Sequence, residues 1–77
     1  MMHLIIFKTS VATKQQALEL QPLLNGLPLI TEHNFDLDDC DNILRVVSTD
    51  LKPEVICELL DNQGFNCEAL ESFIYAR

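Results

Sequence analysis

The sequence predicts a small α+β domain in which four antiparallel strands form one sheet and two helices cover one face of that sheet. Three observations support this prediction. Segments follow in the order strand, helix, strand, strand, helix, strand; each helix carries one apolar stripe; and the link between the middle strands is short enough for a hairpin. The expected strands span residues 4–9, 29–37, 43–48 and 65–70, with helices within residues 13–26 and 53–64.

Length and composition indicate one globular domain, residues 1–77. Hydrophobic residues make up 48% of the chain and charged residues 22%, which is ordinary for a folded protein and argues against disorder. Twelve acidic residues face five basic ones, and the net charge of −7 argues against a nucleic-acid binder, which needs a basic surface. The charge is compatible with a basic protein partner, with cations, or simply with solubility.

No apolar run reaches the ~18 residues that a membrane-spanning helix needs. The first residues, Met-Met-His-Leu-Ile-Ile-Phe-Lys, have neither a basic lead nor a small-residue cleavage site, so we expect no signal peptide. These features predict a cytoplasmic protein without membrane insertion.

The first strand and helix have clear local signals. Residues 4–9 are rich in β-branched and aromatic types and predict a central strand. Thr13 is the expected N-cap of the helix, and Gln16 completes a capping box. Pro22 should kink or loosen the last turn, and Asn25-Gly26 should end the helix through a left-handed residue. The expected buried stripe is Ala17, Leu20 and Leu24.

The two middle strands should pair as an antiparallel hairpin, because few residues separate them. Alternation predicts the two faces of each strand. In the first of these strands, one face should carry Thr31, His33, Phe35 and Leu37, and the other Glu32, Asn34 and Asp36. In the second, one face should carry Leu44 and Val46, and the other Ile43, Arg45 and Val47.

The acidic link between these strands, residues 38–42, resembles a calcium loop only superficially. With Asp36 and Asp38 at the first two ligand positions, a soft Cys40 thiol stands at the third, no glycine follows, and the later glutamate is missing. We therefore expect a solvated turn.

The second helix should begin at Pro53 and end at Asn62-Gln63-Gly64. Glu54 lies in its first turn, where a negative charge interacts favourably with the helix dipole. Its buried stripe is Ile56, Leu59 and Leu60. Residues 65–70 alternate as a last strand, with Phe65, Cys67 and Ala69 on one face. The tail, residues 71–77, leaves three alternatives open: a longer strand, a short helix, or a segment that docks on a partner.

Three cysteines, Cys40, Cys57 and Cys67, occur without a CxxC pair, which favours reduced thiols. Cys57 should lie on an outer or boundary face of its helix and Cys67 in the core, so no two cysteines are expected to meet near Thr13. A thiol in mid-helix beside Glu58 lacks the cation, base or helix N-terminus that activates a nucleophile. We predict no catalytic residue and no enzyme.

The predicted order of elements is the ferredoxin-like βαββαβ arrangement. Fragments spread over nearly the whole chain are Phe7-Lys8-Thr9, Leu20-x-Pro22-x-Leu24-Asn25, Phe35-Asp36-Leu37-Asp38-Asp39, Ile43-Leu44-x-Val46, and Pro53-Glu54-Val55-Ile56 through Asp61-Asn62-Gln63-Gly64-Phe65. In this order they resemble the heavy-metal-associated domain, the fold of small copper chaperones and of the N-terminal modules of metal-transporting ATPases.

This resemblance implies a CxxC pair at the end of the first loop, where two thiolates bind a soft monovalent ion. Aligned on Lys8-Thr9, the pair falls at Thr13 and Gln16, whose hydroxyl and amide groups are hard and weak ligands. The comparison therefore predicts a degenerate site with no metal and no cofactor, at which Thr13 and Gln16 stabilise the helix end.

Two functions follow as expectations. The first is a protein-interaction module that binds a protein partner, or a second copy of itself, through the open sheet face carrying Ile43 and Val47. The alternative is a metal-binding or metal-transport accessory protein. It would use a site shared between chains, or ligands drawn from His3, His33, Cys40 and Cys57.

Overall fold

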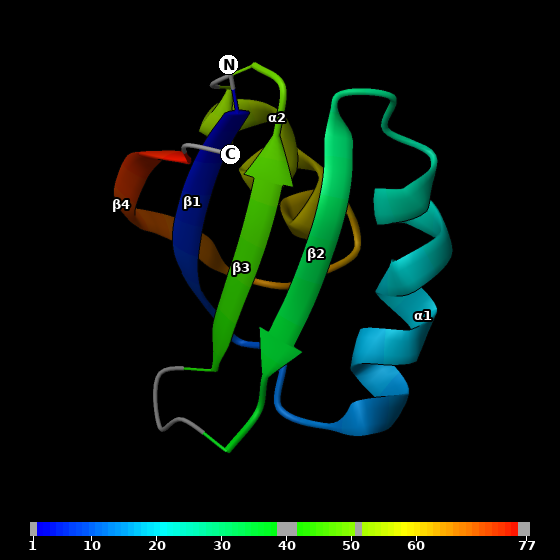
Figure 1. Cartoon of the computed structure of the whole chain (residues 1–77). Coiled ribbons are helices and arrows are strands. Elements are labelled where there is room, and N and C mark those ends of the chain that lie inside the picture. Colours follow the sequence, from blue (N-terminus) through cyan, green and yellow to red (C-terminus); the bar gives the residue numbers. More distant parts are fainter. Residues whose placement is uncertain (1, 39–41, 51, 76–77) are drawn as a thin grey trace.

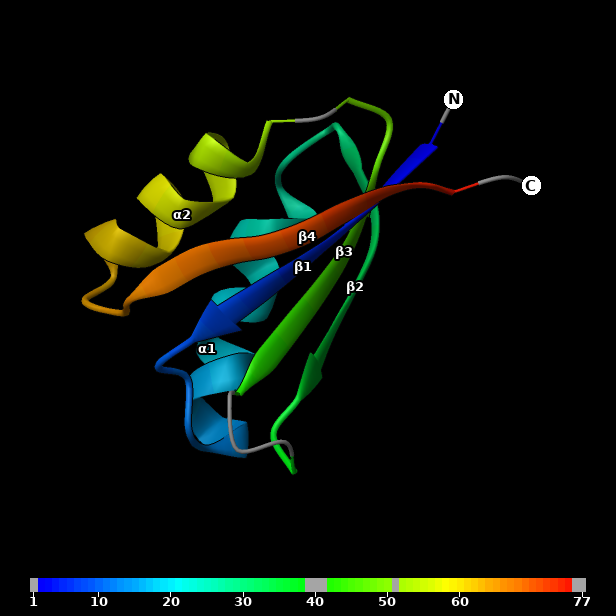
Figure 2. The ribbon, with the colours of Figure 1, turned by 90° about the vertical axis from the view of Figure 1, so that its left-hand side faces the viewer.

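The computed structural model describes residues 2–38, 42–50 and 52–75, and it confirms the predicted α+β fold class. The elements are β1 (Met2–Thr9), α1 (Lys14–Asn25), β2 (Ile30–Asp36), β3 (Ile43–Ser48), α2 (Pro53–Asn62) and β4 (Cys67–Tyr75). All strand pairs are antiparallel, in the order β2-β3-β1-β4 of the ferredoxin-like arrangement. In Figure 1, α1 lies beside β2, and Figure 2 shows both helices on the same side of the sheet.

The core lies between the helices and the inner face of the sheet. Ile5 and Phe7 on β1 stand opposite Val46 and Leu44 on β3, and all four side chains are at most 1% exposed. Alternation along both central strands places these residues on the side of the helices. The helices and the first loop complete the core with Leu20, Leu24, Ile56, Leu60 and Val11.

The register of the hairpin confirms the predicted alternation from Glu32 to Asp36, whereas Thr31 lies at a register irregularity and Leu37 lies beyond the end of β2. His33 stands opposite Val46 and Phe35 opposite Leu44, so these β2 side chains share the helix side with the core. The other face carries the residues predicted for it, from Glu32 on β2 to Val47 on β3. The predicted turn that contains Cys40 lies largely outside the described residues.

The predicted start of the last strand at Phe65 is wrong, because β4 begins two residues later. The strand is nevertheless longer than predicted, because the tail takes the first of its three alternatives and extends it. The strand begins at Cys67 and pairs with β1 as far as Tyr75. The register shifts between Ile6 and Phe7, which stand opposite Glu71 and Ala69, so Leu70 is the extra residue of a bulge.

The prediction that Gly26 ends α1 in a left-handed conformation is wrong. Gly26 has φ −77° and ψ −9°, and its N–H donates to the Pro22 carbonyl oxygen at 3.1 Å. The helix runs through Pro22 to Asn25, and the residue that follows it, Gly26, has a right-handed helical conformation. A bond from Gly26 to a carbonyl four residues earlier satisfies the last turn without any left-handed residue.

α2 begins at Pro53 with Glu54 in its first turn, as predicted, and ends in a Schellman motif. Gly64 has φ +88°, its N–H donates to the Asp61 carbonyl oxygen at 2.9 Å, and the Phe65 N–H donates to the Leu60 carbonyl oxygen at 2.9 Å. Gly64 thus reverses the chain and directs it from α2 into β4.

Candidate functional site

The loop between β1 and α1, where the resemblance implies a metal site, is tied to two neighbouring segments. Thr9 Oγ1 donates to the Asn42 carbonyl oxygen at 2.7 Å and accepts from the Val11 N–H at 3.2 Å. The Ser10 N–H donates to the Asn66 carbonyl oxygen at 3.1 Å, and Ser10 Oγ accepts from the Asn66 N–H at 2.9 Å. These bonds, with Val11 fully buried, hold the loop in place.

Thr13 and Gln16 form the predicted capping box. Thr13 Oγ1 accepts from the Gln16 N–H at 3.1 Å. Gln16 Oε1 accepts from the N–H groups of Ala12 and Thr13 at 2.8 and 3.2 Å. Both side-chain oxygens are therefore engaged with backbone donors of the helix start. The capping box therefore stabilises the N-terminus of α1.

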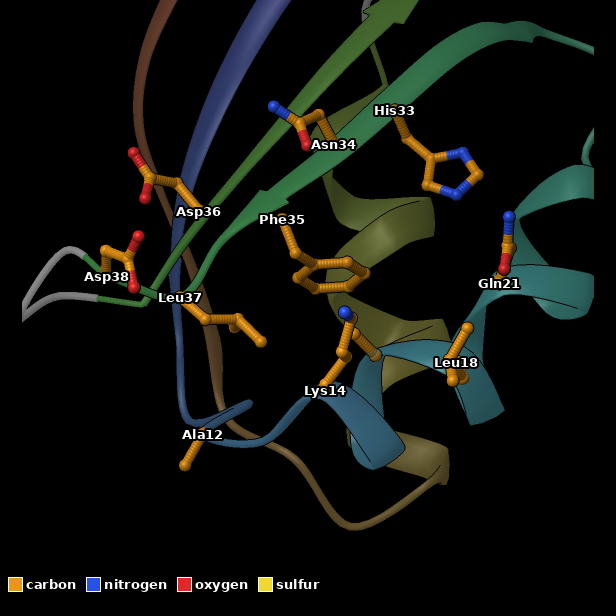
Figure 3. Close-up of a pocket in the computed structure, with 11 residues that line it drawn as sticks. Ala12, Lys14, Leu18, Gln21, His33, Asn34, Phe35, Asp36, Leu37 and Asp38 are labelled. Carbon is orange, nitrogen blue, oxygen red and sulfur yellow. The ribbon is translucent and has the colours of Figure 1, made fainter.

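A groove of about 780 Å³ lies between α1 and the edge strand β2. Its apolar walls are Ala17 and Leu18 on α1 and Phe35 and Leu37 on the β2 side. In Figure 3, the Phe35 ring and the His33 imidazole point from β2 toward α1. Among the described residues that line the groove, none carries a hydroxyl or thiol group, and its polar side chains include Lys14, Gln21 and His33.

His33 is the one predicted ligand among the described residues that lies in this groove. Burial lowers the pKa of the His33 imidazole below its ordinary value, because desolvation disfavours the charged form. Figure 3 shows the ring directed toward the Gln21 side chain on α1. A neutral imidazole packed beside Phe35 fits the expectation of a packing residue.

Of the remaining predicted ligands, the structure describes His3 and Cys57, and it does not bring these two together. His3 lies on β1 opposite Ser48 and Ile74, whereas Cys57 lies on α2, and Cys40 falls outside the described residues. Within the described part of the chain, no three histidine, cysteine, aspartate or glutamate side chains are grouped as a metal site would need.

The structure brings Cys57 and Cys67 together, which the sequence argument missed. The Cys57 thiol donates to Cys67 Sγ, with the two sulfur atoms 3.3 Å apart. Both thiols are free and partly exposed. Only the reversal at Gly64 places a mid-helix residue against the first residue of β4, and a spacing of ten residues without a CxxC motif carries no such signal.

The face of the sheet away from the helices, called here the open face, has a regular arrangement of side chains. Strand register aligns three rows across β2, β3, β1 and β4: Glu32-Val47-Leu4-Phe73, Asn34-Arg45-Ile6-Glu71, and Asp36-Ile43-Lys8-Glu68. The two central strands supply apolar and basic residues to these rows, and the edge strands supply mainly acids.

The first of these rows has three apolar residues, Val47, Leu4 and Phe73. The Phe73 side chain is 48% exposed, and it stands beside Leu4, which in turn stands beside the largely buried Val47. A shallow hollow of about 220 Å³ adjoins Leu4 and Val47, with Glu32 and Arg45 at its rim. An apolar row next to a hollow with charged groups is suited to contact with another macromolecule.

No protein-family model matches the chain, and no curated protein matches it. In the described part of the chain, no helix has the length and apolar character required to cross a membrane.

Proposed function

We propose that this chain is a protein-interaction domain that binds a partner through its open face. The observation that supports the proposal is the exposed Phe73 side chain, which extends the apolar Val47-Leu4 row on the face of the sheet opposite α1 and α2. Exposed aromatic side chains of this kind provide most of the binding energy in many interfaces. The proposal assigns the chain no catalytic role and places it in the cytoplasm.

The proposed partner has an apolar centre and a basic rim. Glu32 and Asp36 lie on the β2 edge of the open face, and Glu68 and Glu71 lie on the β4 edge. These edge acids, together with a net charge of −7, favour a positively charged partner and disfavour a second copy of the same chain.

In this proposal the domain is related to the heavy-metal-associated family and has a degenerate metal site at Thr13 and Gln16. The capping box supports the assignment, because both side-chain oxygens already serve the helix end. This alignment is tested by combining Thr13→Cys with Gln16→Cys and titrating the reduced protein with copper(I). The double variant should gain one copper(I) ion relative to the parent, and a folded variant without that gain would contradict the alignment.

The interaction itself is tested with a photo-crosslinking amino acid in place of Phe73 in cells of the source organism. The matched control position is Leu18, which is 54% exposed but lies on α1. Crosslinks to one basic protein should form from position 73 and not from position 18. Binding of that purified protein should then weaken at least about tenfold for Phe73→Ser and stay unchanged for Leu18→Ser.

Two results would count against the proposed partner. Equal crosslinking from both positions would show that the open face is not selective. Crosslinks between copies of this chain alone would assign the face to self-association. A metal-binding accessory role remains the alternative, and it would require tight metal binding by the parent protein in the same titration.

A further inference from the structure

The structure places two thiols in contact where α2 meets the start of β4. Cys57 and Cys67 have their sulfur atoms 3.3 Å apart, and both thiols are free and partly exposed. A disulfide needs about 2.05 Å between its sulfur atoms, so small side-chain movements suffice to close the gap. The pair is separate from the open face, because Cys67 stands opposite Thr9 on the side of the sheet that faces the helices.

We propose that Cys57 and Cys67 form a redox-modification site that reacts with small cationic disulfides and closes into an intramolecular disulfide between α2 and β4. This inference is independent of the proposed function and would stand if the open face bound nothing.

The surroundings of the two thiols indicate which one reacts with the reagent first and which one then closes the disulfide. Cys57 lines a shallow groove on α2 of about 400 Å³, whereas Cys67 is not among its lining residues. Burial raises the pKa of the Cys67 thiol, and its contact with Cys57 raises the pKa further, which disfavours the Cys67 thiolate while Cys57 is still a free thiol. Cys57 is therefore the thiol that meets an incoming reagent first, and Cys67 is the resolving thiol.

The reaction balances with the reagent as the oxidant. Cys57 loses its thiol proton to solvent, and its sulfur attacks one sulfur of the reagent disulfide, which breaks the reagent S–S bond, forms a mixed disulfide and releases the first reagent thiolate. Cys67 then loses its proton to solvent and attacks Cys57 Sγ, which releases the second reagent thiolate. Two protein thiols lose two electrons and two protons, and the reagent is reduced to two thiols.

The groove determines which reagents react well. Glu54, Glu58 and Asp61 line it beside Cys57, and none of its described lining residues is basic. Three carboxylates around the entrance raise the local concentration of a cationic reagent and repel an anionic one. Screening by salt should remove this selectivity.

The test compares cystamine, a dicationic disulfide, with the dianionic 3,3′-dithiodipropionate on the reduced full chain. Peptide mass mapping should show Cys57 joined to Cys67, with loss of two hydrogens. Cystamine should react about tenfold faster or more at low ionic strength. The rate ratio should fall toward one at about 1 M salt.

Three variants complete the test. Cys67→Ser should stop the reaction at a stable mixed disulfide on Cys57. Glu58→Gln should lower the rate ratio between the two reagents, and Glu19→Gln, which removes an exposed acid on α1 instead, should leave it unchanged. The inference is overturned if the native chain keeps the adduct on Cys57, if it forms only intermolecular disulfides, or if both reagents react equally fast at low salt.

Discussion

Gly64 and Gly26 follow the two helices in opposite backbone conformations, so alanine should have opposite effects at the two positions. Gly64 has φ +88°, a region that disfavours any residue with a Cβ, whereas Gly26 has φ −77°, which alanine adopts readily. The pair forms a matched experiment, because each substitution adds one methyl group at the end of a helix.

The magnitudes follow from the surroundings of each added Cβ. At Gly64 no heavy atom lies within 4 Å of it, so the cost is backbone strain alone, about 1 kcal/mol. At Gly26 the nearest atoms, the carbonyl oxygens of Leu23 and Pro22, lie at 3.4 and 3.5 Å, which is ordinary contact. Alanine there restricts the unfolded chain and should stabilise the fold by about 0.5 kcal/mol.

The assay is urea unfolding followed by far-ultraviolet circular dichroism. With a slope of about 1 kcal/mol per molar urea for so small a domain, Gly64→Ala should lower the midpoint by about 1 M and Gly26→Ala should raise it by about 0.5 M. Gly64→Asn serves as a control and should cost less than alanine, because asparagine tolerates positive φ better. A larger loss at Gly26 than at Gly64 would refute the assigned helix ends.

Three further predictions concern the cap, the groove and the thiols. Thr13→Ala should lower the free energy of unfolding by about 1 kcal/mol, because the Gln16 N–H loses its acceptor, while Thr13→Ser should retain most of the stability in the same urea assay. His33 is stabilising when neutral, since its pKa is lowered in the folded state. As the pH is lowered from about 7.5 to about 5.5, the free energy of unfolding should therefore decrease more for the parent than for His33→Gln. The Cys57–Cys67 disulfide closes a loop with a sequence separation of 10 and should stabilise the fold by about 2 to 3 kcal/mol, measured as a reversible rise in Tm that reductant abolishes.

Each of these predictions has a contrary outcome. Equal losses for Thr13→Ala and Thr13→Ser would mean that the hydroxyl is not the cap. Parallel pH profiles for the parent and His33→Gln would exclude the effect of burial on the imidazole. An oxidised chain that melts no higher than the reduced chain would show that the disulfide strains the junction of α2 and β4.

Structure that neighbouring residues determine could be predicted from the sequence. The capping box depends on Thr13 and Gln16 alone, and the hairpin faces follow from alternation around His33 and Phe35. The prediction failed at Gly26, because an Asn-Gly pair after a helix permits a left-handed end without requiring one. The sequence also left the tail undecided, since only pairing with β1 makes residues up to Tyr75 a strand.

The sequence by itself therefore determined the order of the elements, the buried side of each element and the helix cap at the position of the implied metal pair. Those properties come from periodicity and hydrogen bonds within a few residues. Only the tertiary structure decided that Val47, Leu4 and Phe73 form one row and that Cys57 meets Cys67. These contacts depend on strand register, on the bulge at Leu70 and on the reversal at Gly64, which act between segments distant in the chain.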